Sequence, residues 1–188
     1  FREMMGEQVL PDNSSLGVQH LAVFFSDLRS STAMYQRRGD IAAYLLVREH
    51  FTAIFKAVEQ NGGSAVKTIG DGVMGTFFTN QAALRGIRDS VLAMRRLNER
   101  LNLTGANRLQ LKLGLHAGPC IVVTLNHRLD YFGTTVNIAS RLSTLSEGDD
   151  LVLSASYLED IEARKTVQDM GLLESMQTNL RGIREPVP

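Results

Sequence analysis

The first half of the chain shows the hydrophobic patterns of strands and one long helix. Residues 18–27 form an apolar, strand-prone run that ends in a carboxylate. From Asp40, apolar residues recur at helical spacing as far as position 58, which predicts an amphipathic helix. Residues 65–70 and 73–78 then read as short strands. The Asp-Gly pair between them is a strong hairpin signal.

The second half continues this alternation of strands and helices. Its patterns predict, in order, a helix over 80–97, strands over 109–116 and 120–125 separated by a turn at 117–119, a sheet extension at 129–132, a helix over 133–145, a strand over 151–154, a short helix near Leu158 and a strand over 167–172.

The resulting order, β-α-β-β-α-β-β-α-β, mixes hairpins with helical crossovers. It predicts an α+β domain, ferredoxin-like, in which helices pack on a mostly antiparallel sheet. Residues 1–17 end in a turn-rich stretch and are expected to be an N-terminal connector. Residues 18–188 are expected to form a single domain.

Composition narrows the possible partners. Lys plus Arg equals Asp plus Glu, at 20 each, so no global field favours a nucleic-acid polymer or an anionic lipid surface. No apolar run approaches the roughly 18 residues of a membrane-spanning helix. Because the chain begins at Phe1 rather than Met, we expect that it is cut from a longer protein. The domain itself is expected to be cytoplasmic. The rest of that protein could include a membrane anchor.

Two carboxylates occupy positions suited to metal binding. Asp27 ends a strand and precedes a Ser/Thr-rich helix start, and Asp71 is flanked by glycines at a hairpin tip. Such carboxylates can hold Mg²⁺ while helix N–H groups receive phosphate oxygens. By spacing alone, a capping role for Asp27 and a turn role for Asp71 are the more common outcomes.

Other polar residues are compatible with phosphoryl transfer. Asn137 and Arg141 are spaced to share one helical face, and Asp130 precedes that helix. Arg suits a developing phosphate charge, and an Asn amide can fix a ribose oxygen. Lys67 lies in a predicted strand, where a solvated edge position is the simpler interpretation.

The sequence blocks at 25–32, 67–72 and 130–141 together resemble signatures of class III adenylyl and guanylyl cyclases. Residues 114–118 resemble a fourth block, and residues 180–183 resemble the stretch near the end of that domain. The blocks occur in the family's order. The resemblance implies the class III cyclase fold and conversion of ATP to cyclic AMP and pyrophosphate.

The resemblance also implies residue roles. Asp27 and Asp71 match the ligands of two divalent metal ions, Mg²⁺ or Mn²⁺, with the Leu28 carbonyl as a further ligand. The amides around Ser31 and Thr32 match the phosphate loop. The remaining assignments are Lys67 and Asp130 for the base, Asn137 and Arg141 for ribose and transition state, and Arg181 for the triphosphate. Active sites in this family lie between two subunits, which implies a homodimer. An upstream region of the full-length chain is expected to regulate it.

Base choice follows from hydrogen-bond chemistry. Adenine offers an acceptor at N1 and a donor at N6, which suit the Lys67 ammonium and the Asp130 carboxylate. Guanine reverses both groups, so the pair favours ATP over GTP. A guanylyl cyclase and a catalytically silent dimerisation domain of the same fold remain as alternatives.

Three positions depart from the common family pattern, and one of them, Phe132 in place of a common Trp, is a conservative packing change. Ser30 replaces a frequent Gly, a change expected to be tolerated if the loop needs no positive φ there. Pro119 stands where some members carry an Arg directed at the phosphates, so that contact is expected to be missing.

Overall fold

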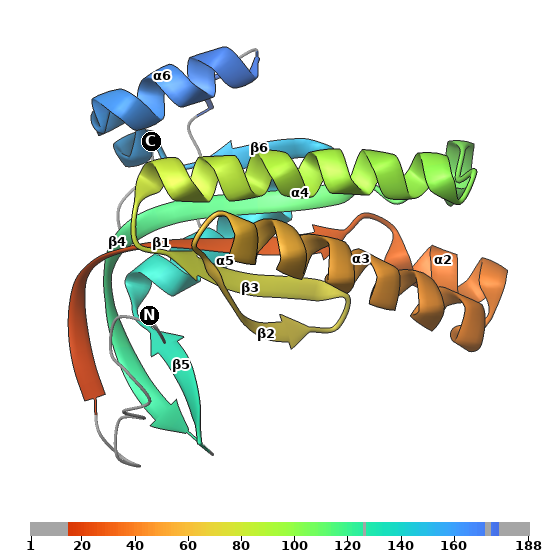
Figure 1. Cartoon of the computed structure of the whole chain (residues 1–188), viewed down its shortest axis with the longest axis horizontal. Helices are drawn as coiled ribbons and strands as arrows, with labels where there is room; N and C mark the ends of the chain where they lie inside the picture. Colours follow the sequence, from red (N-terminus) through yellow and green to blue (C-terminus); the bar gives the residue numbers. More distant parts are fainter. Residues whose placement is uncertain (1–14, 126, 172–173, 177–188) are drawn as a thin grey trace.

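The computed structural model describes residues 15–125, 127–171 and 174–176, and Figure 1 shows the chain. The elements are β1 (Ser15–Leu28), α2 (Ser31–Arg38), α3 (Asp40–Gln60), β2 (Ser64–Ile69), β3 (Gly72–Phe77), α4 (Asn80–Arg100), η1 (Gly105–Asn107), β4 (Leu111–Leu125), β5 (Arg128–Phe132), α5 (Thr134–Leu145), β6 (Asp150–Leu153), η2 (Ala155–Glu159) and α6 (Ile161–Met170). None of the described helices is long and apolar enough to cross a membrane.

The described strands form one sheet in the order β2-β3-β1-β4-β5, and β6 pairs with β4. Every pairing is antiparallel except that of β4 with β6. The predicted α+β class, with helices on a mostly antiparallel sheet, is therefore confirmed. β1 and β4 are the two longest strands and lie next to each other inside the sheet, so they form most of the scaffold that positions the predicted site residues.

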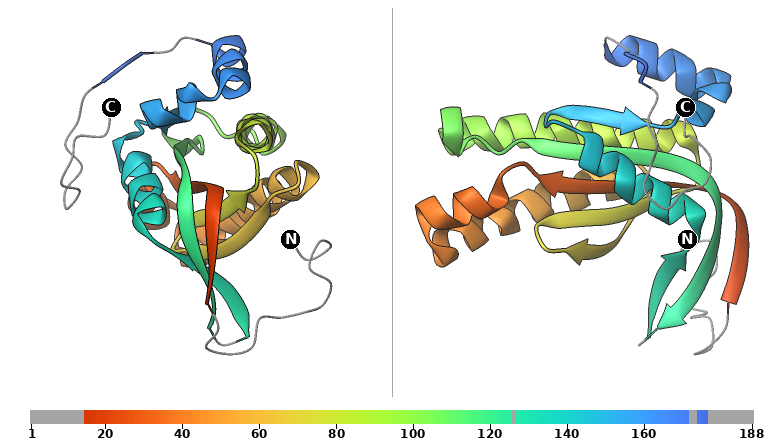
Figure 2. Two further views of the ribbon diagram at one scale, coloured as in Figure 1. Left: turned by 90° about the vertical axis from the view of Figure 1, so that its left-hand side faces the viewer. Right: turned by 180° about the vertical axis from the view of Figure 1, so that it is seen from behind.

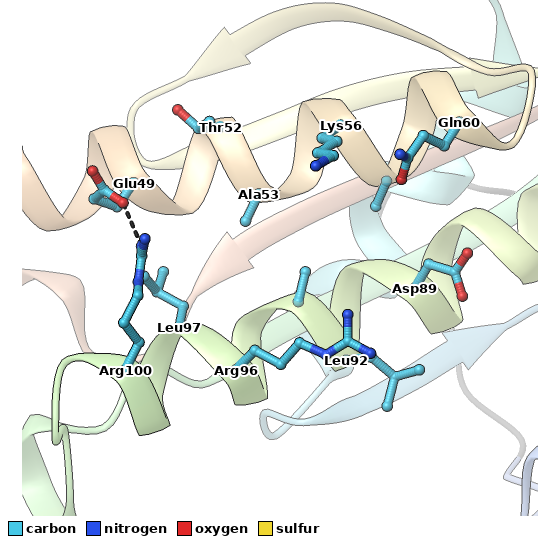
Figure 3. Close-up of a pocket in the computed structure, with 12 residues that line it drawn as sticks. Glu49, Thr52, Ala53, Lys56, Gln60, Asp89, Leu92, Arg96, Leu97 and Arg100 are labelled. Atoms are coloured by element: carbon cyan, nitrogen blue, oxygen red, sulfur yellow. Dashed lines mark hydrogen bonds and ion pairs between the residues drawn. The ribbon is translucent and has the colours of Figure 1, made fainter.

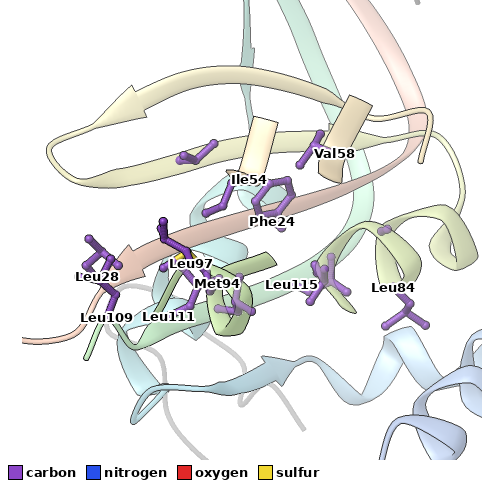
Figure 4. Close-up of a cluster of buried hydrophobic side chains, with 14 of the residues drawn as sticks. Phe24, Leu28, Ile54, Val58, Leu84, Met94, Leu97, Leu109, Leu111 and Leu115 are labelled. Carbon is purple, nitrogen blue, oxygen red and sulfur yellow. The ribbon is translucent and has the colours of Figure 1, made fainter. Parts of the chain in front are cut away.

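Side chains of β1 alternate between two buried layers, as the period of a strand requires. Ala22 and Phe24 face the main core beneath α3 and α4, while Leu21, Val23 and Phe25 face a second cluster on the opposite side. Figure 2 shows α3 and α4 on one side of the sheet and α5 on the other. Figure 4 shows aliphatic side chains of β4 and α4 filling the main core around Phe24.

The predicted turn at 117–119 is wrong, because β4 runs without a break from Leu111 to Leu125. Its partner β1 absorbs the irregularity instead. Val18 pairs with Cys120 and Leu21 with Gly118, so two residues of β1 face Pro119 alone. Proline has no N–H for a ladder bond, and a position opposite a β-bulge tolerates it. Both strands bend sharply in this region (Figure 1).

Two smaller differences concern individual elements. β1 begins at Ser15, three residues before the predicted strand. The predicted strand over 167–172 is wrong for its described residues up to 170, which belong to α6. Ala163 and Val167 are one helical turn apart and both buried, and Asp160 caps the helix through the N–H groups of residues 162 and 163. Local apolar content thus favoured a strand where the spacing was helical.

Candidate active site

Asp27 and Asp71 are brought together at one end of the sheet. Asp27 is the penultimate residue of β1, and Asp71 lies in the turn between β2 and β3. β3 pairs with β1 as far as Val73 opposite Ser26, so the next residues outward on the two strands adjoin each other. Figure 1 shows the end of β1 beside this hairpin.

The two carboxylates are close enough to influence each other electrostatically. Burial raises the pKa of Asp27, and the charge of Asp71 raises it further. The N–H of Leu28 and the ammonium of Lys112 act in the opposite direction. Oδ2 of Asp71 is buried and has no hydrogen-bond partner within the described part of the chain. A carboxylate oxygen in that state is costly unless a cation completes its environment.

These residues fit a divalent metal site of limited protein content. Among the described residues, no group of three or more His, Cys, Asp and Glu side chains could hold a metal ion. Two carboxylates plus substrate phosphates form a common environment for Mg²⁺, which keeps few protein ligands. The unpartnered oxygen of Asp71 is the specific feature that such an ion would satisfy.

The loop after Asp27 ends in a helix N-terminus without a side-chain cap. Ser30 precedes α2, and its side chain makes no capping hydrogen bond. The first N–H groups of a helix, here those of Ser31 and Thr32, have no intrahelical partners and can receive phosphate oxygens. Ser30 has a φ of 57°, in the left-handed region. The loop therefore does use a positive φ at this position, and Ser30 occupies it with strain that glycine would avoid.

Lys67 and Asp130 form a close ion pair. The Lys67 ammonium donates to both carboxylate oxygens of Asp130 at 2.7 Å. Lys67 lies on β2 and Asp130 on β5, which are the two end strands of the sheet order. The pair therefore joins strands that are far apart in the sheet order. Lys67 is exposed on the edge strand β2, as the simpler interpretation expected, and its ammonium also has a specific partner.

Asn137 and Arg141 lie one turn apart on α5, as predicted from their spacing. Asn137 is exposed and Arg141 is partly buried. Neither side chain makes a hydrogen bond or ion pair to another described residue. No such bond links them, or the Lys67–Asp130 pair, to the carboxylates at the end of β1. Arg181 lies outside the described residues.

Sequence reasoning missed what holds α5 on the sheet. A Cβ atom added to Gly114 would lie 2.1 Å from the Ser143 nitrogen and 2.5 Å from the Ala139 carbonyl oxygen. Gly114 therefore lets the α5 backbone approach β4 directly. The Thr135 hydroxyl also donates to the Pro119 carbonyl at 2.8 Å. The glycine of the 114–118 block was the available signal, since glycine often marks a close backbone approach.

Two other polar groups near this region have structural partners. His116 contacts the Ser154 hydroxyl at 2.6 Å, and burial lowers its pKa. Lys112 is the direct cross-strand neighbour of Asp27 and donates to the Thr144 carbonyl. Sequence reasoning did not single out Lys112, although its position in a strand of alternating pattern was visible.

The groove between α3 and α4, of about 670 Å³, lies apart from all of these residues. Figure 3 shows it as an open channel between two helices, with Glu49 and Arg100 paired at one end. None of the predicted site residues lines it.

The sequence matches the family described as adenylate and guanylate cyclase catalytic domain over residues 15–182. The adenylate cyclase of Schizosaccharomyces pombe is 29% identical over 177 residues, covering 80% of this chain and 10% of that protein. The chain thus spans a small part of that relative's length, and the adenylate cyclase of Anabaena cylindrica is matched over only 31% of its own.

Solved structures agree on the fold. The adenylyl cyclase CyaB from P. aeruginosa has a TM-score of 0.73 at 23% identity, covering 93% of each chain. The guanylyl cyclase Cya2 has a TM-score of 0.74 at 21% identity, covering 93% of this chain and 90% of that one. Similar folds therefore carry both nucleotide names. The extent of the family match decides the assignment: this chain belongs to the family of adenylate and guanylate cyclase catalytic domains.

Proposed function

We propose that this cyclase domain is an adenylyl cyclase that converts ATP to 3′,5′-cyclic AMP and pyrophosphate. The observation that carries the choice of base is the Lys67–Asp130 pair at 2.7 Å. A Lys ammonium has three donors and a carboxylate about four acceptor sites, so both groups can serve a base while they remain paired. Adenine N1 accepts from Lys67, and its N6 amino group donates to Asp130.

Guanine fits the same pair poorly. It presents an N–H where adenine presents an acceptor, and a carbonyl where adenine presents an amino group. Lys67 would then face a donor and Asp130 an acceptor, which leaves polar groups of the base and of the pair unmatched. Site contacts of this kind can discriminate by several orders of magnitude.

The other residues take roles around the phosphates and the ribose. Asp27, the Leu28 carbonyl and Asp71 would hold two divalent ions, Mg²⁺ or Mn²⁺. When bound, such ions neutralise phosphate charge and activate the attacking hydroxyl. Ser31 and Thr32 direct main-chain N–H groups at the terminal phosphates. Arg181 is proposed to add positive charge there.

Asn137 and Arg141 act at the reacting centre. The Asn137 amide orients the ribose so that the 3′-oxygen is in line with the α-phosphorus and the leaving pyrophosphate. The Arg141 guanidinium, which cannot lose its proton, stabilises the charge that develops on the transferring phosphoryl group. Both side chains lack partners within the described chain, which supports a role toward a bound substrate.

We propose that the complete site forms between two copies of the chain. One copy supplies Asp27 and Asp71, and the other supplies the base-reading pair together with α5. The exposed apolar surface of β4 and β5 supports this assembly, since Ile121 and Phe132 are paired across the two strands and are 50% and 46% exposed. Leu125, on the same hairpin, is 47% exposed.

Because the chain spans a small part of its relatives' lengths, we propose a longer cytoplasmic parent protein. An upstream region of that protein would regulate the domain, and a membrane anchor elsewhere in it is compatible with this arrangement.

The test is a cyclase assay on the purified domain with Mn²⁺ and either ATP or GTP. We expect cyclic AMP as the main product, with kcat/KM for ATP at least about 10²-fold above that for GTP. Asp27→Asn should abolish turnover, whereas Asp169→Asn, an exposed carboxylate on α6, should leave it unchanged. A preference for GTP would establish the guanylyl alternative. The absence of either product in a folded dimer would establish the silent-domain alternative.

A further inference from the structure

The last pair of the β1–β3 ladder carries a side-chain hydrogen bond. Ser26 pairs with Val73, and beyond this pair the strands continue to Asp27 on one side and to Gly72 and Asp71 on the other. The Val73 N–H donates to the Ser26 hydroxyl oxygen at 3.1 Å. Ser26 is only 4% exposed, so this bond is shielded from water.

The backbones of the two strands are also unusually close at this point. A Cβ atom added to Gly72 would lie 2.3 Å from the Ser26 carbonyl oxygen. Backbone atoms cannot give way as the end of a flexible side chain can. The hairpin therefore contacts Ser26 in two ways. The Val73 N–H bonds to the Ser26 hydroxyl, and Gly72, which has no side chain, allows the hairpin backbone to approach the Ser26 carbonyl.

This contact matters because Oδ2 of Asp71 has no hydrogen-bond partner among the residues that the structure describes. Its position depends on the hairpin backbone that carries it. The Asp27 carboxylate lies at the adjoining end of β1, and two carboxylates of like charge so near to each other repel. A restraint on the hairpin is needed to keep them close enough to share a metal pair.

We propose that Ser26 is a positioning residue, whose hydroxyl anchors the β2–β3 hairpin so that Asp71 stays beside Asp27 and the metal pair binds tightly. This inference rests on the proposed function, since it concerns the metal ligands of that site. Ser26 itself touches neither metal nor substrate. Its effect is transmitted through the Val73 N–H and through Gly72, the one residue that links Val73 to Asp71.

The experiment measures Mn²⁺ binding directly, by the electron paramagnetic resonance signal of free Mn²⁺ titrated with the full chain. Ser26→Ala removes the acceptor, Ser26→Cys keeps the size with a weaker acceptor, and Ser26→Thr keeps the hydroxyl. Ser90→Ala is the matched control, because Ser90 is equally buried but bonds within α4 to the Gly86 carbonyl. Thermal unfolding of each variant is recorded in parallel.

We expect Ser26→Ala to raise the Mn²⁺ concentration for half-saturation at least about tenfold, a factor typical of lost support for metal ligands. Ser26→Cys should give a smaller rise, and Ser26→Thr should stay within about threefold of the parent. Ser90→Ala should leave Mn²⁺ binding unchanged even where it lowers the unfolding temperature. In the cyclase assay at saturating Mn²⁺, KM for ATP should change little. If Ser26→Ala does not fold, the comparison of Ser26→Cys with Ser26→Thr decides the question.

Parental Mn²⁺ affinity in folded Ser26→Ala, or in Ser26→Cys, would overturn the inference. Failure of Ser26→Thr to retain affinity would also overturn it. These results differ from failure of the proposed function, which is judged on the parent and on Asp27→Ala. If the parent binds Mn²⁺, forms cyclic AMP and loses both with Asp27→Ala, the function stands and only the role of Ser26 is at issue. A parent that neither binds Mn²⁺ nor forms the product would overturn both.

Discussion

Replacing Gly114 by Ala tests how the helix that carries Asn137 and Arg141 is positioned. The added methyl group would lie 2.1 Å from the Ser143 nitrogen and 2.5 Å from the Ala139 carbonyl oxygen, both main-chain atoms of α5. Ordinary contacts between such atoms are about 3.5 Å, so α5 must move away from β4 by about 1 Å or more. Arg141 lies between the two contacted residues and moves with them.

Two consequences follow from this displacement. Overpacking of the α5–β4 contact should lower the free energy of unfolding by about 1–3 kcal/mol. A shift of about 1 Å in a positioning element can cost about 10²-fold in rate, so kcat for cyclic AMP formation should fall by about that factor. Mn²⁺ binding should persist, because Asp27 and Asp71 lie on other elements.

Leu115→Ala separates lost stability from lost position. Leu115 adjoins Gly114 on β4, is fully buried, and belongs to the main core. Its truncation should cost about 2–5 kcal/mol without pushing on α5, so kcat should remain near the parental value wherever the protein is folded. Urea unfolding and initial rates on both variants give the comparison. A folded Gly114→Ala enzyme with kcat within about threefold of the parent would refute the reasoning.

Three further predictions concern other parts of the chain. Burial lowers the pKa of His50 to about 4, from 6.5 in the unfolded chain, and neither ring nitrogen has a hydrogen-bond partner within the described residues. The stability contributed by neutral His50 is fully present above about pH 6.5 and is lost as the pH falls toward 4. The free energy of unfolding in urea should therefore fall by about 3 kcal/mol over this range, and this fall should be absent in His50→Leu. Equal pH slopes for the two proteins would contradict the prediction. Ser30→Gly should stabilise the domain by up to about 1 kcal/mol in thermal unfolding. Glycine adopts the positive φ without strain, and its larger loss of backbone entropy on folding is smaller than the strain that is removed. Destabilisation by this substitution would contradict the prediction. Lys67→Glu combined with Asp130→Cys should shift the ratio of kcat/KM values from ATP toward GTP. The loss for ATP should be large, at about 1–3 kcal/mol for each polar group of adenine left without a partner. If both activities fell together at a constant ratio, the pair would be supporting the fold instead.

The sequence predicted the elements whose signals are local. The Asp-Gly hairpin, the helical spacing of Asn137 and Arg141, and the strand that ends near Asp27 all depend on neighbouring residues, and the structure has each of them. The turn expected at Pro119 failed for the opposite reason. A bulge in β1, about a hundred residues earlier in the chain, accommodates the proline, and no local pattern can reveal that.

The same distinction applies to the site. Metal ligation, base reading and the role of Arg141 came from the family resemblance, and they stay predictions. That Lys67 would meet Asp130 could not follow from spacing, because the contact joins strands at opposite ends of the sheet order. The contact between Ser26 and the hairpin that carries Asp71 could not be predicted from the sequence either. It depends on a buried hydroxyl and a backbone approach that only the packed structure shows.

The most direct test of the account mixes two inactive chains and measures cyclic AMP formed from ATP with Mn²⁺. Asp27→Ala disables the metal half of each site, and Arg141→Ala disables the transition-state half. In a two-fold dimer, a mixed pair restores one complete site, so an equimolar mixture should reach about a quarter of the parental activity. A mixture of Asp27→Ala with Asp71→Ala, which both disable the same half, should stay inactive. Absence of recovery in the first mixture, despite demonstrated exchange of subunits, would contradict a site built between two copies of this chain.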